Sequence, residues 1–357
     1  MKKIIFLLTC LLIMVSISGC LFREYFGFVS VSSDPSGALI YIDNQEVGVT
    51  EEGNPIKIKL KTGNHQLKIA LDGVKITKNI TIQKDEVLPV TIFFSVIANI
   101  TVDTGDAEIF YWQDKGDYPQ GTSLGQITKA TNFRFVEPGV YWFYAKKSGR
   151  VFTAKCVTLS QNSEITNIAL TSVTTTAART DESTTIRGRT FLAPWEMEQY
   201  VKYKNPNNNI YVAKYYLYFG SLLNITGDWA YCQAIHETGF FKFGGDVKPE
   251  QNNYAGIGAT GGGAGGASFN TPEEGVLAQL QHLWAYAVPS TEGEPAPIQK
   301  YPNKTGYWWN LDPRYKYVSK GCAPRWVNLN GKWAVPGETY AQMILNHRNN
   351  MLNFLGY

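Results

Sequence analysis

The residue best suited to acid–base chemistry is Glu237, within the run Ala-Ile-His-Glu-Thr-Gly-Phe-Phe at residues 234–241. The apolar spacing predicts a helix over Asp228–Glu237, which places this carboxyl group at the helix C-terminus. The helix dipole there opposes a negative charge, and the phenylalanines at positions 240, 241 and 243 can exclude water. Both effects raise the pKa of a carboxyl group and favour its protonated form. Such a group can donate a proton to a leaving oxygen, as cleavage of a glycosidic bond requires.

Two other kinds of site are excluded by residue spacing. His236-Glu237 would begin a zinc-protease motif only if a second His stood at position 240, where the chain has Phe. The Gly-rich run at 256–266 lacks the Gly-Lys-Ser/Thr ending of a phosphate-binding loop. The four histidines, at positions 65, 236, 282 and 347, have no metal-ligand spacing. We therefore expect neither a metal nor another cofactor.

Three helices are expected to carry this part of the chain, over Asn209–Leu223, Asp228–Glu237 and Thr271–Tyr286. Thr271, followed by Pro272 and by Glu274 three residues on, is typical of a helix N-terminus with a capping box. Asp228 is expected to cap its own helix, because Gly227 interrupts the chain just before it. A mainly helical domain is therefore predicted over residues 191–357.

The motifs in this region resemble those of the glucosaminidase-type peptidoglycan hydrolases, glycoside hydrolase family seventy-three. Four motifs occur in order within about residues 195–350: Gln233–Gly239, Asn252–Gly258, Phe269–Val276 with His282-Leu283, and Asp312–Tyr315. The resemblance implies a lysozyme-like α+β fold and cleavage of the β-1,4 linkage between N-acetylglucosamine and N-acetylmuramic acid. It also implies site residues: Glu237 as the general acid, Tyr315 as an assisting catalytic group, and Asn253, Tyr254 and Gly256 in the substrate groove.

The second catalytic group is left open. Asp246 and Glu250 follow Glu237 in a loop and could reach the groove. Glu273 and Glu274 are also candidates, although Glu274 is better explained as the capping-box residue. Alternatively, the substrate's acetamido oxygen is the nucleophile, as the resemblance allows. The Gly-rich run at 261–266 is longer than the family's loop, which leaves the substrate fit there open.

Two strand-rich modules are predicted before this domain, at residues 20–96 and 97–170, because short apolar/polar alternations are separated by turn residues. Ser33–Ala38, Ile40–Asp43 and Thr62–His65 resemble the PEGA module, a small β-sandwich of bacterial surface proteins. The second module repeats the first weakly, with an offset of 76 from Thr62-Gly63 to Pro138-Gly139. His65 is expected to be solvated in a turn. The Ser/Thr-rich residues 171–190 are predicted to be a flexible linker of about 25 Å.

The N-terminal sequence predicts export to the cell envelope. Lys2 and Lys3, an apolar run and Ile17-Ser18-Gly19-Cys20 resemble a lipoprotein signal over residues 1–19, with Cys20 as the lipidated residue. The apolar run is shorter than the ~20 residues of a membrane-spanning helix. We expect a lipid anchor on the outer side of the membrane. Of the remaining cysteines (156, 232 and 322), a Cys232–Cys322 disulfide is possible, and free thiols are favoured.

The composition agrees with a folded envelope protein. Charged residues make up 18%, aromatic residues 13%, and the net charge is +3, which argues against disorder and against nucleic-acid binding. The expected partners are peptidoglycan strands and the membrane, and the expected state is a monomer. Two alternatives remain: a lytic transglycosylase or muramidase, and an inactive cell-wall-binding surface lipoprotein. Glycan length, peptide preference and physiological role are not predicted.

Overall fold

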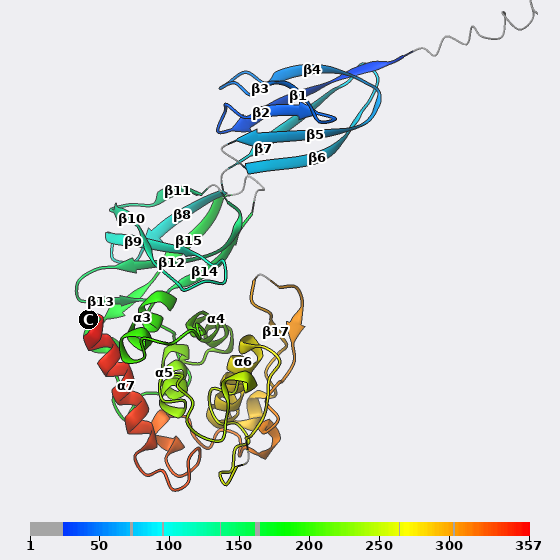
Figure 1. Cartoon of the computed structure of the whole chain (residues 1–357). Coiled ribbons are helices and arrows are strands. Elements are labelled where there is room, and N and C mark those ends of the chain that lie inside the picture. The colour runs from blue at the N-terminus through cyan, green and yellow to red at the C-terminus, as the bar shows by residue number, and fades with distance from the viewer. Residues whose placement is uncertain are drawn as a thin grey trace, which may run out of the picture. The chain divides into compact units, whose positions relative to one another are not determined.

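The structure is a computed structural model that describes residues 24–71, 74–94, 96–135, 137–160, 165–263, 265–302 and 304–357. The expected signal segment 1–19 and Cys20 lie outside these residues. The chain forms two compact units that meet between residues 95 and 96, and each is described by itself (Figure 1). No helix in the described part of the chain combines the length and the apolar character needed to span a membrane.

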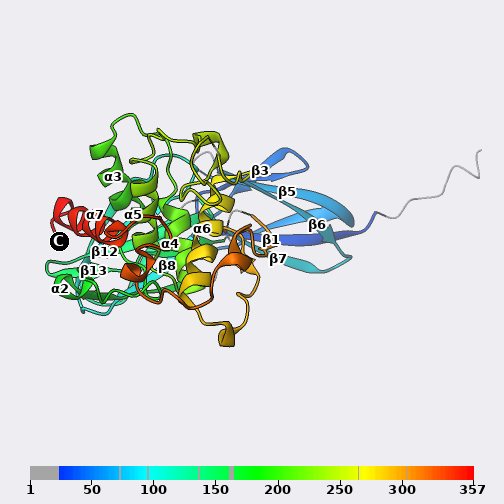
Figure 2. The ribbon, with the colours of Figure 1, turned by 90° about the horizontal axis from the view of Figure 1, so that it is seen from below.

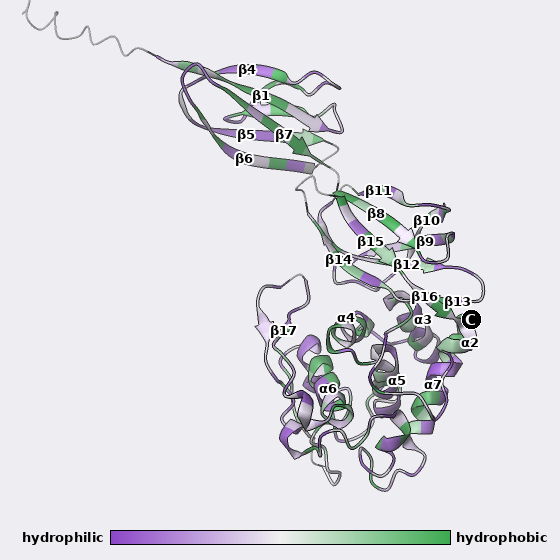
Figure 3. Ribbon diagram, turned by 180° about the vertical axis from the view of Figure 1, so that it is seen from behind, coloured by the Kyte–Doolittle hydropathy of each residue, from purple (hydrophilic) through white to green (hydrophobic). Residues whose placement is uncertain are grey.

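The first unit is a β-sandwich. A three-stranded sheet has the order β4-β1-β7, with β1 antiparallel to β4 and parallel to β7, and it faces a four-stranded sheet of order β3-β2-β5-β6. Alternate residues point into the core, among them Val29, Val31, Ile40 and Ile69, all fully buried. Figure 3 shows the resulting alternation of colour along β6. The strand bounds are β1 Phe26–Asp34, β2 Leu39–Ile42, β3 Gln45–Val49, β4 Ile56–Lys61, β5 Gly63–Leu71, β6 Val74–Ile82 and β7 Val87–Phe93.

The second unit begins with a sandwich of the same topology. Its sheets have the orders β11-β8-β15 and β10-β9-β12-β14, and β8 is again antiparallel to one neighbour and parallel to the other. The expectation of two small all-β sandwiches is therefore confirmed. An additional pair, β13 and β16, lies beside the second sandwich. The bounds are β8 Val96–Val102, β9 Ala107–Gln113, β10 Thr122–Ile127, β11 Thr131–Phe135, β12 Gly139–Lys146, β13 Arg150–Phe152, β14 Lys155–Leu159, β15 Ile165–Leu170 and β16 Ser172–Thr174.

Residues 171–190 are not the flexible coil that their composition predicts. Ser172–Thr174 form strand β16, and Thr175–Ala178 form the short helix α2. The side chain of Ser172 donates to Asp103 Oδ1 at 2.9 Å, and Ile186 is fully buried. The segment is ordered because its backbone and hydroxyl groups find hydrogen-bond partners on both sides, which composition alone does not reveal.

The C-terminal part is mainly helical, with six α-helices in the described residues from α2 onward. Helix α5 packs against α4, α6 and α7, and Figures 1 and 2 both show it between α6 and α7. Short 3₁₀ turns and one small hairpin occupy the long connections. The bounds are α3 Pro194–Lys204, α4 Ala213–Leu223, α5 Gly227–Glu237, η1 Pro249–Gln251, α6 Pro272–Ala287, η2 Ser290–Glu292, β17 Ile298–Gln299, β18 Tyr307–Trp308, η3 Tyr315–Tyr317, η4 Trp326–Leu329 and α7 Tyr340–Phe354.

Helix ends follow the expected capping in part. The Thr271 side chain accepts a hydrogen bond from the Glu274 backbone at the start of α6, as expected. Helix α4 begins at Ala213 rather than Asn209, because the buried Glu198 carboxylate accepts the Ala213 N–H. Asp228 does not cap α5. It lies in the first helical turn, fully buried, and pairs with Arg348 of α7 at 2.8 Å.

The second sandwich and the helical part share one continuous core. All six residues of β12 from Val140 to Ala145 are buried, on both faces of the strand. One face packs inside the sandwich, and the other meets the helical part, where Trp142 Nε1 donates to Tyr301 O–H at 2.6 Å. Next to it, Lys214 of α4 contacts both carboxylate oxygens of Asp114 at 2.9 Å. The helical part is therefore built against the sandwich.

Candidate active site

Glu237 ends helix α5, and its carboxyl group opens to solvent at the wall of a pocket. The Tyr340 hydroxyl donates a hydrogen bond to Glu237 Oε1. Desolvation by the surrounding protein raises the pKa of Glu237, while hydrogen bonds from Tyr340 and Trp333 lower it in part. The balance is a carboxyl group with a raised pKa that still faces solvent. An acid catalyst needs both properties.

A buried hydrogen-bond chain fixes the direction of the Tyr340 bond. Tyr216 donates to Gln279 Oε1, and the Gln279 amide donates to Gln233 Oε1 at 2.8 Å. The Gln233 amide in turn donates to the Tyr340 oxygen at 2.8 Å. Because Tyr340 accepts from Gln233, its own hydrogen points at Glu237. Helices α4, α5, α6 and α7 each contribute to this chain, so the helix packing positions the Glu237 carboxyl group.

The pocket in front of Glu237 has a volume of about 180 Å³. Asp246 lines it together with Glu237, so two carboxyl groups face one space. Gly256, at φ +62°, lies directly opposite, and a Cβ there would come within 3.8 Å of Glu237 Oε2. That distance is an ordinary contact, so it is the positive φ rather than a lack of space that favours glycine at this position. The other lining residues are Thr238, Phe243, Gly244, Gly245, Val247, Asn253 and Ala259.

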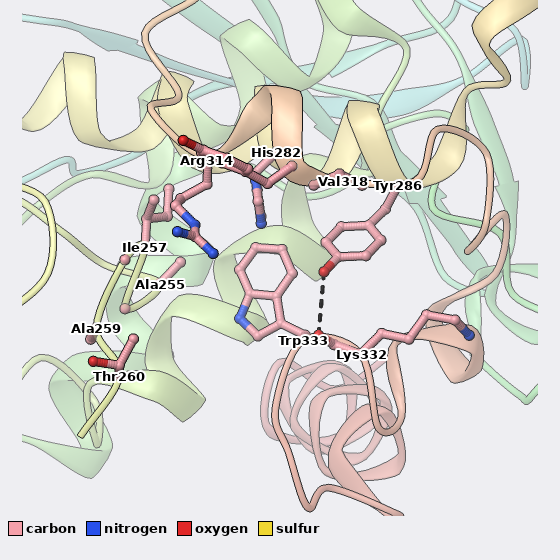
Figure 4. A pocket seen from close by; sticks show the side chains of 13 residues that line it. Ala255, Ile257, Ala259, Thr260, His282, Tyr286, Arg314, Val318, Lys332 and Trp333 are labelled. Carbon is pink, nitrogen blue, oxygen red and sulfur yellow. Dashed lines mark hydrogen bonds between the residues drawn. The ribbon is translucent and has the colours of Figure 1, made fainter. Parts of the chain in front are cut away.

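A second pocket, of about 170 Å³, adjoins the first, since Gly256 and Ala259 line both. Figure 4 shows the Arg314 guanidinium, the His282 ring and the Trp333 indole around this space. Trp333 lines this second pocket, and its ring lies 4.9 Å from the His282 ring. The two pockets therefore lie side by side, with Gly256 and Ala259 at their common edge.

The predicted groove residues take different places. Gly256 lines both pockets. Asn253 lines the Glu237 pocket, but its side chain is committed to Ile257 and Ala267, and it is only 1% exposed. Tyr254 is 2% exposed, packs on Phe241 and is absent from the described lining of both pockets. These two residues hold the loop rather than present free groups to a ligand.

Tyr315, expected to assist at the reacting sugar, is not among the described lining residues of either pocket. It begins the turn η3, is 6% exposed, and stacks on Trp284 with ring centroids 6.3 Å apart. Its neighbours Arg314 and Tyr317 do line the second pocket. The structure therefore gives Tyr315 a packing role that orients this turn. The residue that contacts Glu237 is Tyr340.

The candidates for a second carboxylate are now separated by position. Glu274 accepts the Asn270 N–H, as a capping residue does, and the buried Glu273 accepts the Tyr301 N–H and pairs with Lys304. Glu250 is exposed outside the described lining of both pockets. Asp246 alone of the four lines the Glu237 pocket.

The structure also places the cysteines and His65. Cys156, Cys232 and Cys322 are free, so the preference for free thiols is confirmed. His65 lies on strand β5 rather than in a turn, and its ring contacts Asp43 at 2.7 Å. Within the described residues no group of three or more His, Cys, Asp or Glu side chains is arranged to hold a metal ion.

Each comparison with known proteins matches only part of the chain. Residues 26–95 match the PEGA domain family, so the first sandwich is a PEGA domain. An uncharacterized protein of Borreliella burgdorferi is 37% identical over 158 residues, which cover 42% of this chain and 67% of that protein. The chain belongs to the same family as this Borreliella protein. A solved structure, the Bacillus anthracis TIE protein, matches with a TM-score of 0.20 and 15% identity over 42% of this chain, and the chain spans only 34% of it.

Proposed function

We propose that the helical part is a glycoside hydrolase that cleaves the β-1,4 linkage between N-acetylglucosamine and N-acetylmuramic acid in peptidoglycan. The observation that carries the proposal is the Glu237 carboxyl group: its pKa is raised, it faces a solvent-open pocket, and Tyr340 fixes its position. The motif resemblance of residues 195–350 to family seventy-three supports the choice of substrate.

In this mechanism Glu237 donates its proton to the glycosidic oxygen, since an alkoxide is a poor leaving group. The resulting carboxylate then accepts a proton from the attacking water, which restores the acid. Asp246 faces the same pocket and is the carboxylate that can stabilise positive charge on the sugar ring. The substrate's acetamido oxygen is the alternative nucleophile. Gly256 lines both pockets, and Trp333 lines the second one.

Mass spectrometry of the muropeptides released from purified peptidoglycan tests this activity. We expect products with reducing N-acetylglucosamine ends. Reducing N-acetylmuramic acid ends would instead identify a muramidase, and anhydro-N-acetylmuramic acid ends would identify a lytic transglycosylase. If the protein binds cell walls but releases no soluble fragment, it is an inactive wall-binding protein and the proposal is wrong.

We further propose that the mature chain is a lipoprotein of the cell envelope, anchored through Cys20 and exposed outside the membrane. The support is the basic, apolar and small-residue order of residues 2–20. Several acyl chains on one Cys suffice for stable anchoring, whereas a single chain gives marginal binding. Growth with a labelled fatty acid is expected to label the wild-type protein and not Cys20→Ala. Equal labelling of both proteins would overturn this proposal.

A further inference from the structure

The second pocket contains a cation without an acidic partner. Arg314 lines it, and among the described residues the guanidinium has no carboxylate within ion-pair distance. Within the described part of the chain, the guanidinium carbon lies 4.8 Å from the centroid of the Tyr317 ring. None of the 13 lining residues is Asp or Glu. The pocket is therefore positively charged and open, whereas the adjoining Glu237 pocket carries two carboxyl groups.

The backbone of Arg314 is held firmly. Asp312 Oδ1 accepts the Arg314 N–H at 2.8 Å, and Asp312 Oδ2 contacts His282 Nδ1 of helix α6 at 2.7 Å. Asp312 is 6% exposed. These two bonds tie the turn that carries Arg314 to helix α6, and the Asp312 carboxylate is bonded to the Arg314 backbone and the His282 ring rather than to the guanidinium.

The other nearby cation is already engaged. The Lys332 ammonium donates to the Asn328 carbonyl at 2.9 Å, and Figure 4 shows it pointing away from the space that Arg314 faces. Aromatic rings complete the wall: Trp333 lies against His282, and Tyr286 donates to the Lys332 carbonyl. One planar cation between aromatic surfaces suits a carboxylate on a ring-bearing ligand, because a guanidinium can bind both oxygens of a carboxylate.

We propose that the Arg314 pocket binds a carboxylate group of the substrate beside the linkage that Glu237 cleaves. This inference rests on the proposed function, and it adds that the enzyme distinguishes glycans that carry carboxylates from neutral ones. The carboxylate has two sources in peptidoglycan: the lactyl group of N-acetylmuramic acid where the peptide has been removed, and the stem peptide where it remains. The shared Gly256 and Ala259 put this carboxylate one pocket away from the acid.

The experiment measures binding of three soluble glycans to the full chain carrying Glu237→Gln, which prevents turnover. The glycans are stem-bearing strands, amidase-treated strands with free lactyl carboxylates, and neutral chitohexaose. Adding Arg314→Gln is expected to weaken binding of at least one carboxylate-bearing glycan about tenfold at low salt, and to leave chitohexaose binding unchanged. Arg314→Lys is expected to lose less affinity, since it keeps the charge without the planar fork.

Lys316→Gln is the matched control. Lys316 is exposed, lies two residues away, contacts the same Tyr317 ring at 5.1 Å, and is not among the lining residues. It is expected to leave the affinity for all three glycans unchanged. If Lys316→Gln weakens binding as much as Arg314→Gln, a general surface charge is responsible and the pocket proposal is wrong.

The possible outcomes distinguish the two sources of the carboxylate, and they distinguish failure of the Arg314 proposal from failure of the proposed function. Weaker binding of stem-bearing strands alone identifies the stem carboxylate, and weaker binding of amidase-treated strands alone identifies the lactyl group. Equal loss for all three glycans, or no loss for any, overturns the Arg314 proposal while the glycan specificity of the enzyme stands. If the Glu237→Gln chain binds none of the glycans, the proposed function itself fails, and the Arg314 proposal fails with it.

Discussion

Replacing Glu237 by Gln is expected to lower the rate of peptidoglycan solubilisation by about two to four orders of magnitude. The amide keeps the shape of the side chain and can still accept the Tyr340 hydrogen bond, but it has no proton to transfer. The measurement is the initial rate of turbidity loss of purified cell walls at equal protein concentration. Asp181→Asn is a matched control, because Asp181 is exposed and, in the described chain, its carboxylate accepts hydrogen bonds only from the backbone and hydroxyl of Ser183.

Tyr340→Phe tests the same acid through its pKa. The Tyr340 bond stabilises the ionised carboxylate and lowers the pKa of Glu237 against the effect of desolvation. Its removal therefore raises that pKa. Because Glu237 must be protonated to act, activity is lost as the pH rises through its pKa, and the alkaline limb of the kcat/KM profile moves to higher pH. An unchanged limb in Tyr340→Phe, or wild-type solubilisation by Glu237→Gln, would show that Glu237 is not the acid.

The position of Glu237 at the end of a helix could be predicted from the sequence because its signals are local. A helix end, following phenylalanines and a short motif all lie within residues 228–243. Tyr340 could not be predicted, since it lies 103 residues further along the chain and contacts Glu237 only through the packing of α7 on α5. The positions of Tyr254 and Tyr315 outside the described lining of both pockets could not be predicted for a related reason. A motif marks residues needed by the site without distinguishing those that touch the ligand from those that hold the loop.

The sandwiches could be predicted from alternation and turns, but their relation to the helical part could not. Strand β12 reads Val-Tyr-Trp-Phe-Tyr-Ala at residues 140–145, an unbroken apolar run without alternation. Such a run is typical of a strand covered on both faces. It was the available signal that this sandwich packs against another layer. The polar composition of residues 171–190, in contrast, indicates a flexible linker.

A fragment of residues 96–357 is therefore expected to unfold in one cooperative transition, whereas a fragment of residues 191–357 is expected to lack a stable fold. Removing the sandwich takes Asp114 from the buried Lys214, and breaking such a pair costs about 3–5 kcal/mol. Removing the sandwich also removes the buried Trp142, which packs on the helical part and donates to the Tyr301 hydroxyl. Losing a buried Trp side chain lowers the free energy of unfolding by about 3–5 kcal/mol. Together these are comparable to the whole stability of a domain, about 5–15 kcal/mol.

Thermal unfolding followed by circular dichroism checks this expectation, with point variants of the 96–357 fragment as a second arm. Asp114→Ala is expected to lower the free energy of unfolding by about 3–5 kcal/mol, because it leaves the buried Lys214 ammonium unpaired. Asp117→Ala, at an exposed position three residues away, is expected to change the free energy of unfolding by less than about 0.5 kcal/mol.

A 191–357 fragment that melts at the same temperature as 96–357 and cuts peptidoglycan equally well would show that the second sandwich is only a spacer. Reduced stability of that fragment would instead show that the sandwich supports the fold of the helical part. Helix α4 links the two, because it carries both Lys214 and the Tyr216 that begins the hydrogen-bond chain to Tyr340.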